Sequence, residues 1–128
     1  MEHRATVNWR RESADFTYDS YNRAHDWRFH AVSVPASSAP EFRGDAARVN
    51  PEEAFVASLS SCHMLTFLAL AARRKLSLET YSDEAVGYLE KDAAGRLVMS
   101  RVILRPKIAW RRRRGVRGRT RCHASYRA

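Results

Sequence analysis

The polar and hydrophobic positions in the first third of the chain follow the alternation of β-strands. Apolar and aromatic residues recur at about every second position in three stretches, residues 3–10, 14–21 and 27–35. The polar residues 22–26 predict a turn between the last two stretches. We therefore expect a meander of two or three strands. A loop should follow over residues 35–49, where Pro, Ser and Gly recur.

The clearest local pattern predicts a helix that begins after Asn50. Asn50 is a favourable N-cap, Pro51 suits the first helical position, and Glu53 completes a capping box three residues after the cap. Residues 54–72 are apolar on nearly every side, and the basic residues 73–75 suit the C-terminal end of a helix. We expect a central helix that is buried on most of its faces, and not a membrane span, because Ser, Cys, His and Thr interrupt it.

The region after this helix predicts a long hairpin. Residues 76–92 and 97–108 carry strand patterns, and residues 92–95 between them are turn formers. Strands, one buried helix and a hairpin predict an α+β fold. The length of 128 residues suits one domain. No apolar targeting segment begins the chain, so we expect a cytoplasmic protein.

The net charge of +9 is concentrated at the C-terminal end. Residues 111–128 contain eight arginines and no acidic residue, which leaves +1 for residues 1–110. We expect residues 1–110 to form the folded domain. Residues 111–128 should be a poorly ordered tail, because Val116 is their one large aliphatic residue and they show no amphipathic period.

The two cysteines, Cys62 and Cys122, provide neither a disulfide framework nor a zinc-binding spacing. Cys62 lies near the middle of the predicted helix, where a cysteine is commonly a small core residue. The serines around it would also leave room for a ligand beside a reactive thiol. His63 should point away from Cys62, because adjacent residues of a helix do not face each other. Glu52 can be explained by the helix dipole, and Arg23 as a solvated turn residue.

A specific motif surrounds Cys62. Asn-Pro-Glu at residues 50–52 leads into a helix of small residues that reaches Ser-Cys-His at 61–63 and continues through Leu68. This segment is similar to the signature of the OsmC/Ohr family of thiol peroxidases, and the resemblance extends over about residues 10–108. It implies an OsmC-like fold, with antiparallel strands around a long helix, in an intertwined homodimer whose subunits share active sites. It also implies reduction of organic hydroperoxides, and in some members of hydrogen peroxide, in oxidative-stress defence.

The resemblance also implies roles for individual residues. By position in the motif, Cys62 becomes the thiol that attacks the peroxide, and Glu52 the carboxylate that orients an arginine. Arg23 fits best as this arginine. Three other arginines are alternatives: Arg28, Arg43 and Arg48. A thiolate is the nucleophile, a guanidinium stabilises it, and a carboxylate holds the guanidinium in place. No cofactor or metal is implied, and the expected partners are the peroxide and an external thiol reductant, either a small dithiol or a lipoylated protein.

The spacing of Glu52 and Cys62 supports a dimer independently of the family resemblance. Ten residues separate them, which is about 15 Å along a helix at 1.5 Å per residue. A single helix cannot bring both side chains into one site. If both serve the same site, one of them must come from a second subunit.

The C-terminal tail departs from the family, which has a second helix with a resolving cysteine here. Cys122 lies sixty positions after Cys62, near the expected place, but its neighbours differ from those in the family. Cys122 could therefore be a resolving thiol or an incidental exposed thiol. The tail itself could contact nucleic acid or another acidic surface, or it could result from a change of reading frame near codon 110 of a GC-rich gene.

Two further functions compete with peroxide reduction. One is a catalytically impaired OsmC-like domain that binds an apolar small molecule at its dimer interface. The other is nucleic-acid binding through the basic tail. On sequence alone nucleic acid is not the expected partner, because Tyr126 is the only aromatic residue of the tail and stacking would be poor. No membrane partner is expected either.

Overall fold

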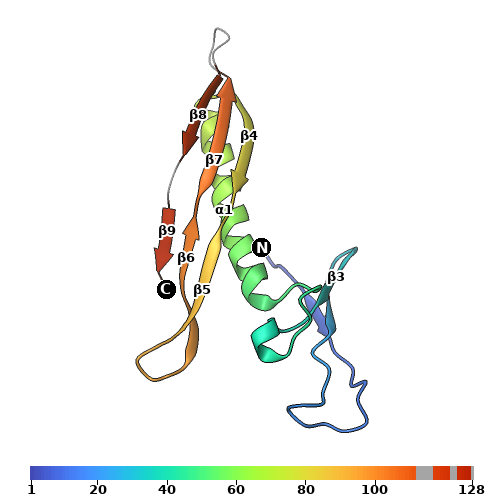
Figure 1. Cartoon of the computed structure of the whole chain (residues 1–128). Coiled ribbons are helices and arrows are strands. Elements are labelled where there is room, and N and C mark those ends of the chain that lie inside the picture. Colours follow the sequence, from blue (N-terminus) through green and yellow to red (C-terminus); the bar gives the residue numbers. More distant parts are fainter. Residues whose placement is uncertain (112–116, 122–123, 128) are drawn as a thin grey trace. The chain divides into compact units, whose positions relative to one another are not determined.

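The computed structural model describes residues 1–111, 117–121 and 124–127 (Figure 1). Strands occupy both ends of the chain, and a single long helix lies between them in sequence. The α+β class predicted from the sequence is therefore confirmed. The chain forms two compact units, Met1–Ala54 and Phe55–Ala128.

The first unit contains a small antiparallel sheet in the order β1-β2-β3. Its strands are β1 (Thr6–Asn8), β2 (His25–Phe29) and β3 (Val32–Ala36). The strand expected over residues 27–35 is split by a turn at His30, whose positive φ of 47° reverses the chain. The strand expected over residues 14–21 is wrong: these residues form bends and turns, because the side chains of Thr17 and Ser20 bond each other and the local backbone.

The loop over residues 35–49 is closed by hydrogen bonds at its base. The amide of Ser37 donates to the carbonyl of Val49 at 2.9 Å, and a parallel bridge joins Ala36 to Val49. Within the loop, residues Pro40–Phe42 form the 3-10 helix η1. Gly44 passes so close to Ser38 that a Cβ there would lie 1.5 Å from the Ser38 carbonyl oxygen. The loop therefore requires glycine at position 44.

Helix α1 (Pro51–Arg73) begins with the predicted capping box. The Glu53 amide donates to Asn50 Oδ1 at 2.8 Å, and the Asn50 amide donates to Glu53 Oε2 at 3.2 Å. At the other end Lys75 adopts a left-handed conformation with φ 58°, and Leu76 N bonds the carbonyl of Ala71. Both predicted ends of the helix are confirmed.

Among the described residues of the second unit, six strands follow α1 and form two three-stranded sheets, β4-β7-β8 and β5-β6-β9. Their bounds are β4 Leu78–Asp83, β5 Val86–Lys91, β6 Leu97–Leu104, β7 Pro106–Arg111, β8 Arg117–Arg121 and β9 Ala124–Arg127. Only Arg105 separates β6 from β7, so these two form one long segment of chain that lies at the centre of both sheets (Figure 1).

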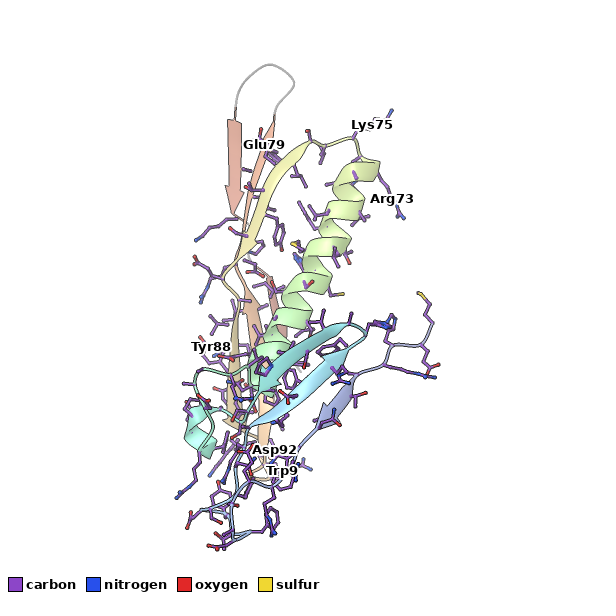
Figure 2. All side chains as sticks on the ribbon, turned by 90° about the vertical axis from the view of Figure 1, so that its right-hand side faces the viewer. Trp9, Arg73, Lys75, Glu79, Tyr88 and Asp92 are labelled. Carbon is purple, nitrogen blue, oxygen red and sulfur yellow. The ribbon has the colours of Figure 1, made fainter. Side chains whose placement is uncertain are left out.

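The predicted hairpin is confirmed in β5 and β6, which are joined by a tight turn at Asp92 (labelled in Figure 2). Gly95 has a φ of 78° in this turn. Asp92 accepts hydrogen bonds from the backbone and the guanidinium of Arg96 and from the amide of Ala94. These bonds, the backbone bond from Arg96 first among them, hold the pKa of Asp92 below its usual value.

Two of the strands lie in the segment that the sequence predicted to be a poorly ordered tail. Strand β8 pairs with β7, and β9 pairs with β6, both antiparallel. These pairings extend the sheets beyond residue 110, although the division of the chain at that residue stays a prediction. Cys122 lies outside the described residues.

Candidate active site

Helix α1 packs on the strands of the second unit through one face only (Figure 1). Near its start, a Cβ added at Gly87 would meet Val56 at 2.4 Å, so glycine allows the close approach of helix and strand. Ser60 donates a hydrogen bond to Asp83 at 2.5 Å. One and two turns later, His63 bonds the Tyr81 hydroxyl at 2.9 Å and Phe67 lies 6.1 Å from the Tyr81 ring.

The opposite face of α1 is exposed in the single chain. It carries Phe55, Leu65 and Leu70, which are 45%, 60% and 49% exposed. Ala71 is the one residue of the helix that is fully buried. The sequence predicts a helix that is buried on most of its faces. In a single chain only one face is packed, so the prediction is met for that face alone. By length and composition α1 could cross a membrane, a test that the core helices of soluble proteins also pass.

Cys62 lies on this exposed face. It is a free cysteine among the described residues, and its side chain is exposed, whereas that of a small core residue would be buried. Ser58 and Thr66, one turn before and one turn after it, are exposed as well. His63 is half-buried and bonded to Tyr81, so it turns toward the strands, as the helical spacing predicted. Cys62 is thus accessible to a small reagent, beside apolar and small polar neighbours.

Arg23 is buried in the first unit, where the sequence suggested a solvated turn residue. Only 9% of it is exposed. Its two terminal nitrogens donate to the carbonyl oxygens of Tyr18 and Tyr21, and its Cζ lies 3.7 Å from the centre of the Tyr21 ring. Its Nε is buried without a hydrogen-bond partner among the described residues. A buried guanidinium with a spare N–H can donate a further hydrogen bond to an anion or another oxygen acceptor.

The sequence did not reveal an aromatic cluster in the same unit, two of whose rings, Tyr18 and Tyr21, lie against the guanidinium of Arg23. The rings of Trp9, Phe16 and Tyr21 lie 5.5 to 6.3 Å apart, and Tyr18 lies 6.5 Å from Tyr21. The expected strand over residues 14–21 would have separated these rings onto two faces. The Ser and Thr residues between them, which favour turns, were the available signal.

Glu52 and Glu53 occupy the first turn of α1 but have different surroundings. Glu53 makes the capping bond with Asn50. Glu52 is partly buried, and its Oε2 is buried without a hydrogen-bond partner in the part of the chain that the structure describes. Capping therefore accounts for Glu53 and leaves Glu52 unexplained. A buried carboxylate oxygen without a partner is costly, so a partner from outside the chain would stabilise it.

The surroundings of the other candidate arginines favour Arg23. Arg43 pairs with Asp19 at 2.8 Å. Arg48 pairs with Asp45 at 3.7 Å, and Arg28 is exposed on β2. In the described residues no ion pair joins Arg23 to Glu52, so that pairing stays a prediction.

Comparisons with known proteins agree with the motif around Cys62. The family model described as OsmC-like protein matches residues 44–111, which include Glu52 and Cys62. The chain belongs to the OsmC-like family. A solved structure of an OsmC-like protein of unknown function from Vibrio cholerae O1 biovar eltor is similar, with a TM-score of 0.81 and 44% sequence identity. The match covers 87% of this chain and 76% of the Vibrio chain. A search of curated proteins found no match.

Membership of the OsmC-like family confirms the predicted fold class, an α+β arrangement with a long helix packed against antiparallel strands. The family includes peroxidases and its members are commonly homodimers. The Vibrio protein is of unknown function, so the similarity to it establishes the fold and the family and leaves the reaction open.

Proposed function

We propose that this OsmC-like protein is a thiol-dependent peroxidase that reduces organic hydroperoxides through Cys62, in a reducing compartment such as the cytoplasm. The observation that carries the proposal is the exposed thiol of Cys62 in the middle of the family-matched helix. A cysteine that packed as a core residue would have been buried on the strand side, where His63 and Phe67 lie.

A homodimer is part of this proposal. The exposed face of α1 holds large apolar side chains, and a second copy of the chain would remove them from water. Glu52 lies about 15 Å along the helix from Cys62, so a site with both needs Glu52 from the other copy. The unpartnered atoms of Arg23 and Glu52 support the same conclusion, because each still lacks a hydrogen-bond partner in the described residues.

In the proposed reaction the Cys62 thiolate attacks one oxygen of the peroxide. The S–O bond forms as the O–O bond breaks, and the leaving oxygen takes a proton to become an alcohol. Cys62 is then a sulfenic acid. Arg23 stabilises the thiolate and the leaving oxygen, and Glu52 orients the guanidinium.

The sulfenic acid condenses with a second thiol, which forms a disulfide and releases water. Cys122 is the proposed resolving thiol. An external dithiol or lipoylated protein then reduces the disulfide and returns both thiols to the starting state.

The test is to mix reduced protein with one equivalent of cumene hydroperoxide and to follow intact mass and free thiols. We expect rapid oxidation of the wild type and none of Cys62→Ser. Cys122→Ser should still be oxidised once, to the sulfenic acid of Cys62, and a second equivalent of peroxide should take it to the sulfinic acid in place of a disulfide. Wild-type protein that keeps both thiols reduced would disprove peroxidase activity.

The role of Arg23 needs a separate comparison. Arg23→Gln should slow oxidation of Cys62 strongly, while Arg28→Gln, an exposed arginine of the same unit, should leave the rate unchanged. Circular dichroism of both variants controls for folding, because Arg23 also bonds two carbonyl groups. Equal rates of Cys62 oxidation in the two variants would show that Arg23 is not part of the active site.

A second function is favoured by the apolar face of α1. A catalytically impaired domain could bind an apolar small molecule beside Phe55 and Leu65 in the dimer. Saturable binding of a fluorescent fatty acid, together with a Cys62 that stays reduced in peroxide, would identify this function.

A further inference from the structure

Arg23 is held at its backbone as well as at its side chain. Its terminal nitrogens donate to the carbonyl oxygens of Tyr18 and Tyr21, which lie in the same irregular segment of the chain. These two bonds close the segment on itself. A bond to the neighbouring sheet comes from His25, whose Nδ1 lies 2.8 Å from the carbonyl oxygen of Arg23.

His25 and Trp27 belong to strand β2, and the strand places both rings on one face of the sheet. Residues two positions apart on a strand point to the same side. Trp27 lies opposite Val7 of β1 and Val34 of β3, so the ladder holds its backbone on both sides. The Nε1 atom of Trp27 lies 3.0 Å from Nε2 of His25. A chain of two hydrogen bonds therefore runs from Trp27 through His25 to the carbonyl of Arg23.

The donors and acceptors of this chain fix the charge of His25. A carbonyl oxygen only accepts hydrogen bonds, so Nδ1 of His25 must carry the proton that it donates to Arg23. An indole N–H only donates, so Nε2 must offer its lone pair to Trp27. Both contacts are satisfied by one form of the ring, the neutral imidazole with its proton on Nδ1. A protonated ring would set an N–H against the indole N–H of Trp27, and that bond would be lost.

The charged groups around His25 lie at its backbone or on the other face of the sheet. From the loop over residues 35–49, Arg48 Nη1 donates to the His25 carbonyl at 3.4 Å, and Arg48 pairs with Asp45 at 3.7 Å. Asp26 and Arg28, the neighbouring charged residues of β2, are exposed and point to the opposite side. In the described part of the chain, the two ring nitrogens thus bond to a carbonyl oxygen and an indole, and to no charged group.

We propose that His25, oriented by Trp27, is a positioning residue for Arg23, and that it acts only as the neutral ring. The inference rests on the proposed role of Arg23 beside the reacting thiol. The Nε of Arg23 is buried and has no hydrogen-bond partner among the described residues, so the direction of this donor decides what it can bind. His25 and Trp27 set that direction by tying the irregular segment to β2. Protonation of His25 at acidic pH breaks the contact with Trp27 and loosens the segment.

Nuclear magnetic resonance tests the hydrogen-bond chain without any reaction. Long-range proton–nitrogen spectra at about pH 8 should show His25 as the tautomer with its proton on Nδ1. The indole N–H signal of Trp27 should move in His25→Phe, and it should move in the wild type as the pH falls to about 5. The opposite tautomer, or an indole signal that neither change moves, would overturn the proposal.

A kinetic test follows the oxidation of Cys62 by excess cumene hydroperoxide in a single turnover. His25→Phe keeps a flat ring without its nitrogens and should slow the oxidation by about tenfold to a hundredfold, because a small misplacement of a reacting group can cost that much. His25→Asn should restore most of the rate, since its amide N–H can still donate to the Arg23 carbonyl. The matched control is His30→Asn, which replaces an exposed histidine at the turn between β2 and β3. It should keep the wild-type rate, because Asn readily adopts the φ of 47° found there.

The pH profile separates positioning from a purely structural role. Titration of the Cys62 thiol affects the wild type and His25→Asn alike, so it cancels in the ratio of their rates. This ratio should exceed one at about pH 8 and fall toward one at about pH 5, because the protonated ring loses the bond to Trp27 that an asparagine does not make. In a Trp27→Phe background the same ratio should not depend on pH.

Failure of this inference differs from failure of the peroxidase. Wild-type protein that keeps Cys62 reduced would disprove the peroxidase, and the positioning role would fall with it. Wild-type protein that is oxidised no faster than His25→Phe, or with a rate ratio to His25→Asn that is constant across pH, would overturn the role of His25 alone. Circular dichroism shows whether each variant is folded. If His25→Phe does not fold, the ratio of the wild-type rate to that of His25→Asn decides.

Discussion

The two faces of α1 are built from the same helix but have opposite surroundings. The face with Ser60 and His63 is bonded to strand β4 of the same chain. The face with Cys62 and Leu65 is exposed to solvent in the single chain. One face therefore stabilises the fold of the single chain, while the other is available for a second copy and for chemistry.

The strongest test of this contrast moves the thiol between faces. In a background of Cys62→Ser and Cys122→Ser, with Leu65→Asp to keep the chain monomeric, Ser60→Cys places a thiol on the strand side and Ser58→Cys places one on the open side, one turn before Cys62. The thiol at position 60 should resist iodoacetamide in the folded protein, and the thiol at position 58 should react at about the rate of a free thiol. Mass spectrometry over time measures both. Equal reaction rates at the two positions would contradict the contrast.

The next test introduces a charge on the open face. Leu65→Asp should weaken the proposed dimer by about a hundredfold, because an unpaired carboxylate loses its hydration in an apolar interface. Analytical ultracentrifugation measures the change. Leu97→Asp, at a position 50% exposed at the start of β6, is the matched control and should leave the dimer intact. A Leu65→Asp protein with wild-type self-association would show that this face is not the interface.

Deleting a phenylalanine from each face compares their contributions to stability. In the Leu65→Asp background, Phe67→Ala should lower the free energy of unfolding by about 2–3 kcal/mol, because it removes packing against Tyr81. Phe55→Ala, at a position 45% exposed, should cost under about 1 kcal/mol in the same background. Urea unfolding measures both costs. Similar costs would mean that the two faces are equally packed in a single chain.

The smallest effect concerns the polar contact on the packed face. Asp83 accepts bonds from Ser60 at 2.5 Å and from the amide of Arg105 at 2.6 Å. Asp83→Asn should lower the free energy of unfolding by about 1 kcal/mol, because one acceptor oxygen becomes a donor. Adding Ser60→Ala should cost less in Asp83→Asn than in the wild type. Full additivity in urea unfolding would show that the two side chains are not coupled.

Local signals in the sequence were reliable where neighbouring residues decide the structure. The capping box at Asn50 and the turn at Asp92 formed as predicted, because their hydrogen bonds join residues three or four positions apart. The sequence misplaced the strand at residues 14–21, where alternating aromatic residues resemble a strand but the local Ser and Thr bonds favour turns.

For the candidate site, the sequence and its family motif identified Cys62 and Glu52 as residues to examine. The sequence could not show that Glu53 caps the helix while an oxygen of Glu52 stays unpartnered in the described chain, since both suit a first helical turn. Nor could it show that Arg23 is buried against Tyr21, because that contact depends on how the turn closes.

By itself, the sequence determined the α+β class, the ends of the long helix, the hairpin and the family, because these depend on short-range patterns and on one continuous motif. The tertiary structure decided which face of α1 is packed and which carries Cys62, since an all-round apolar helix has no periodicity that distinguishes its faces. It also decided the place of the arginines in β8 and β9. Strand pairing depends on hydrogen bonds to distant segments, and a basic composition alone does not predict these bonds.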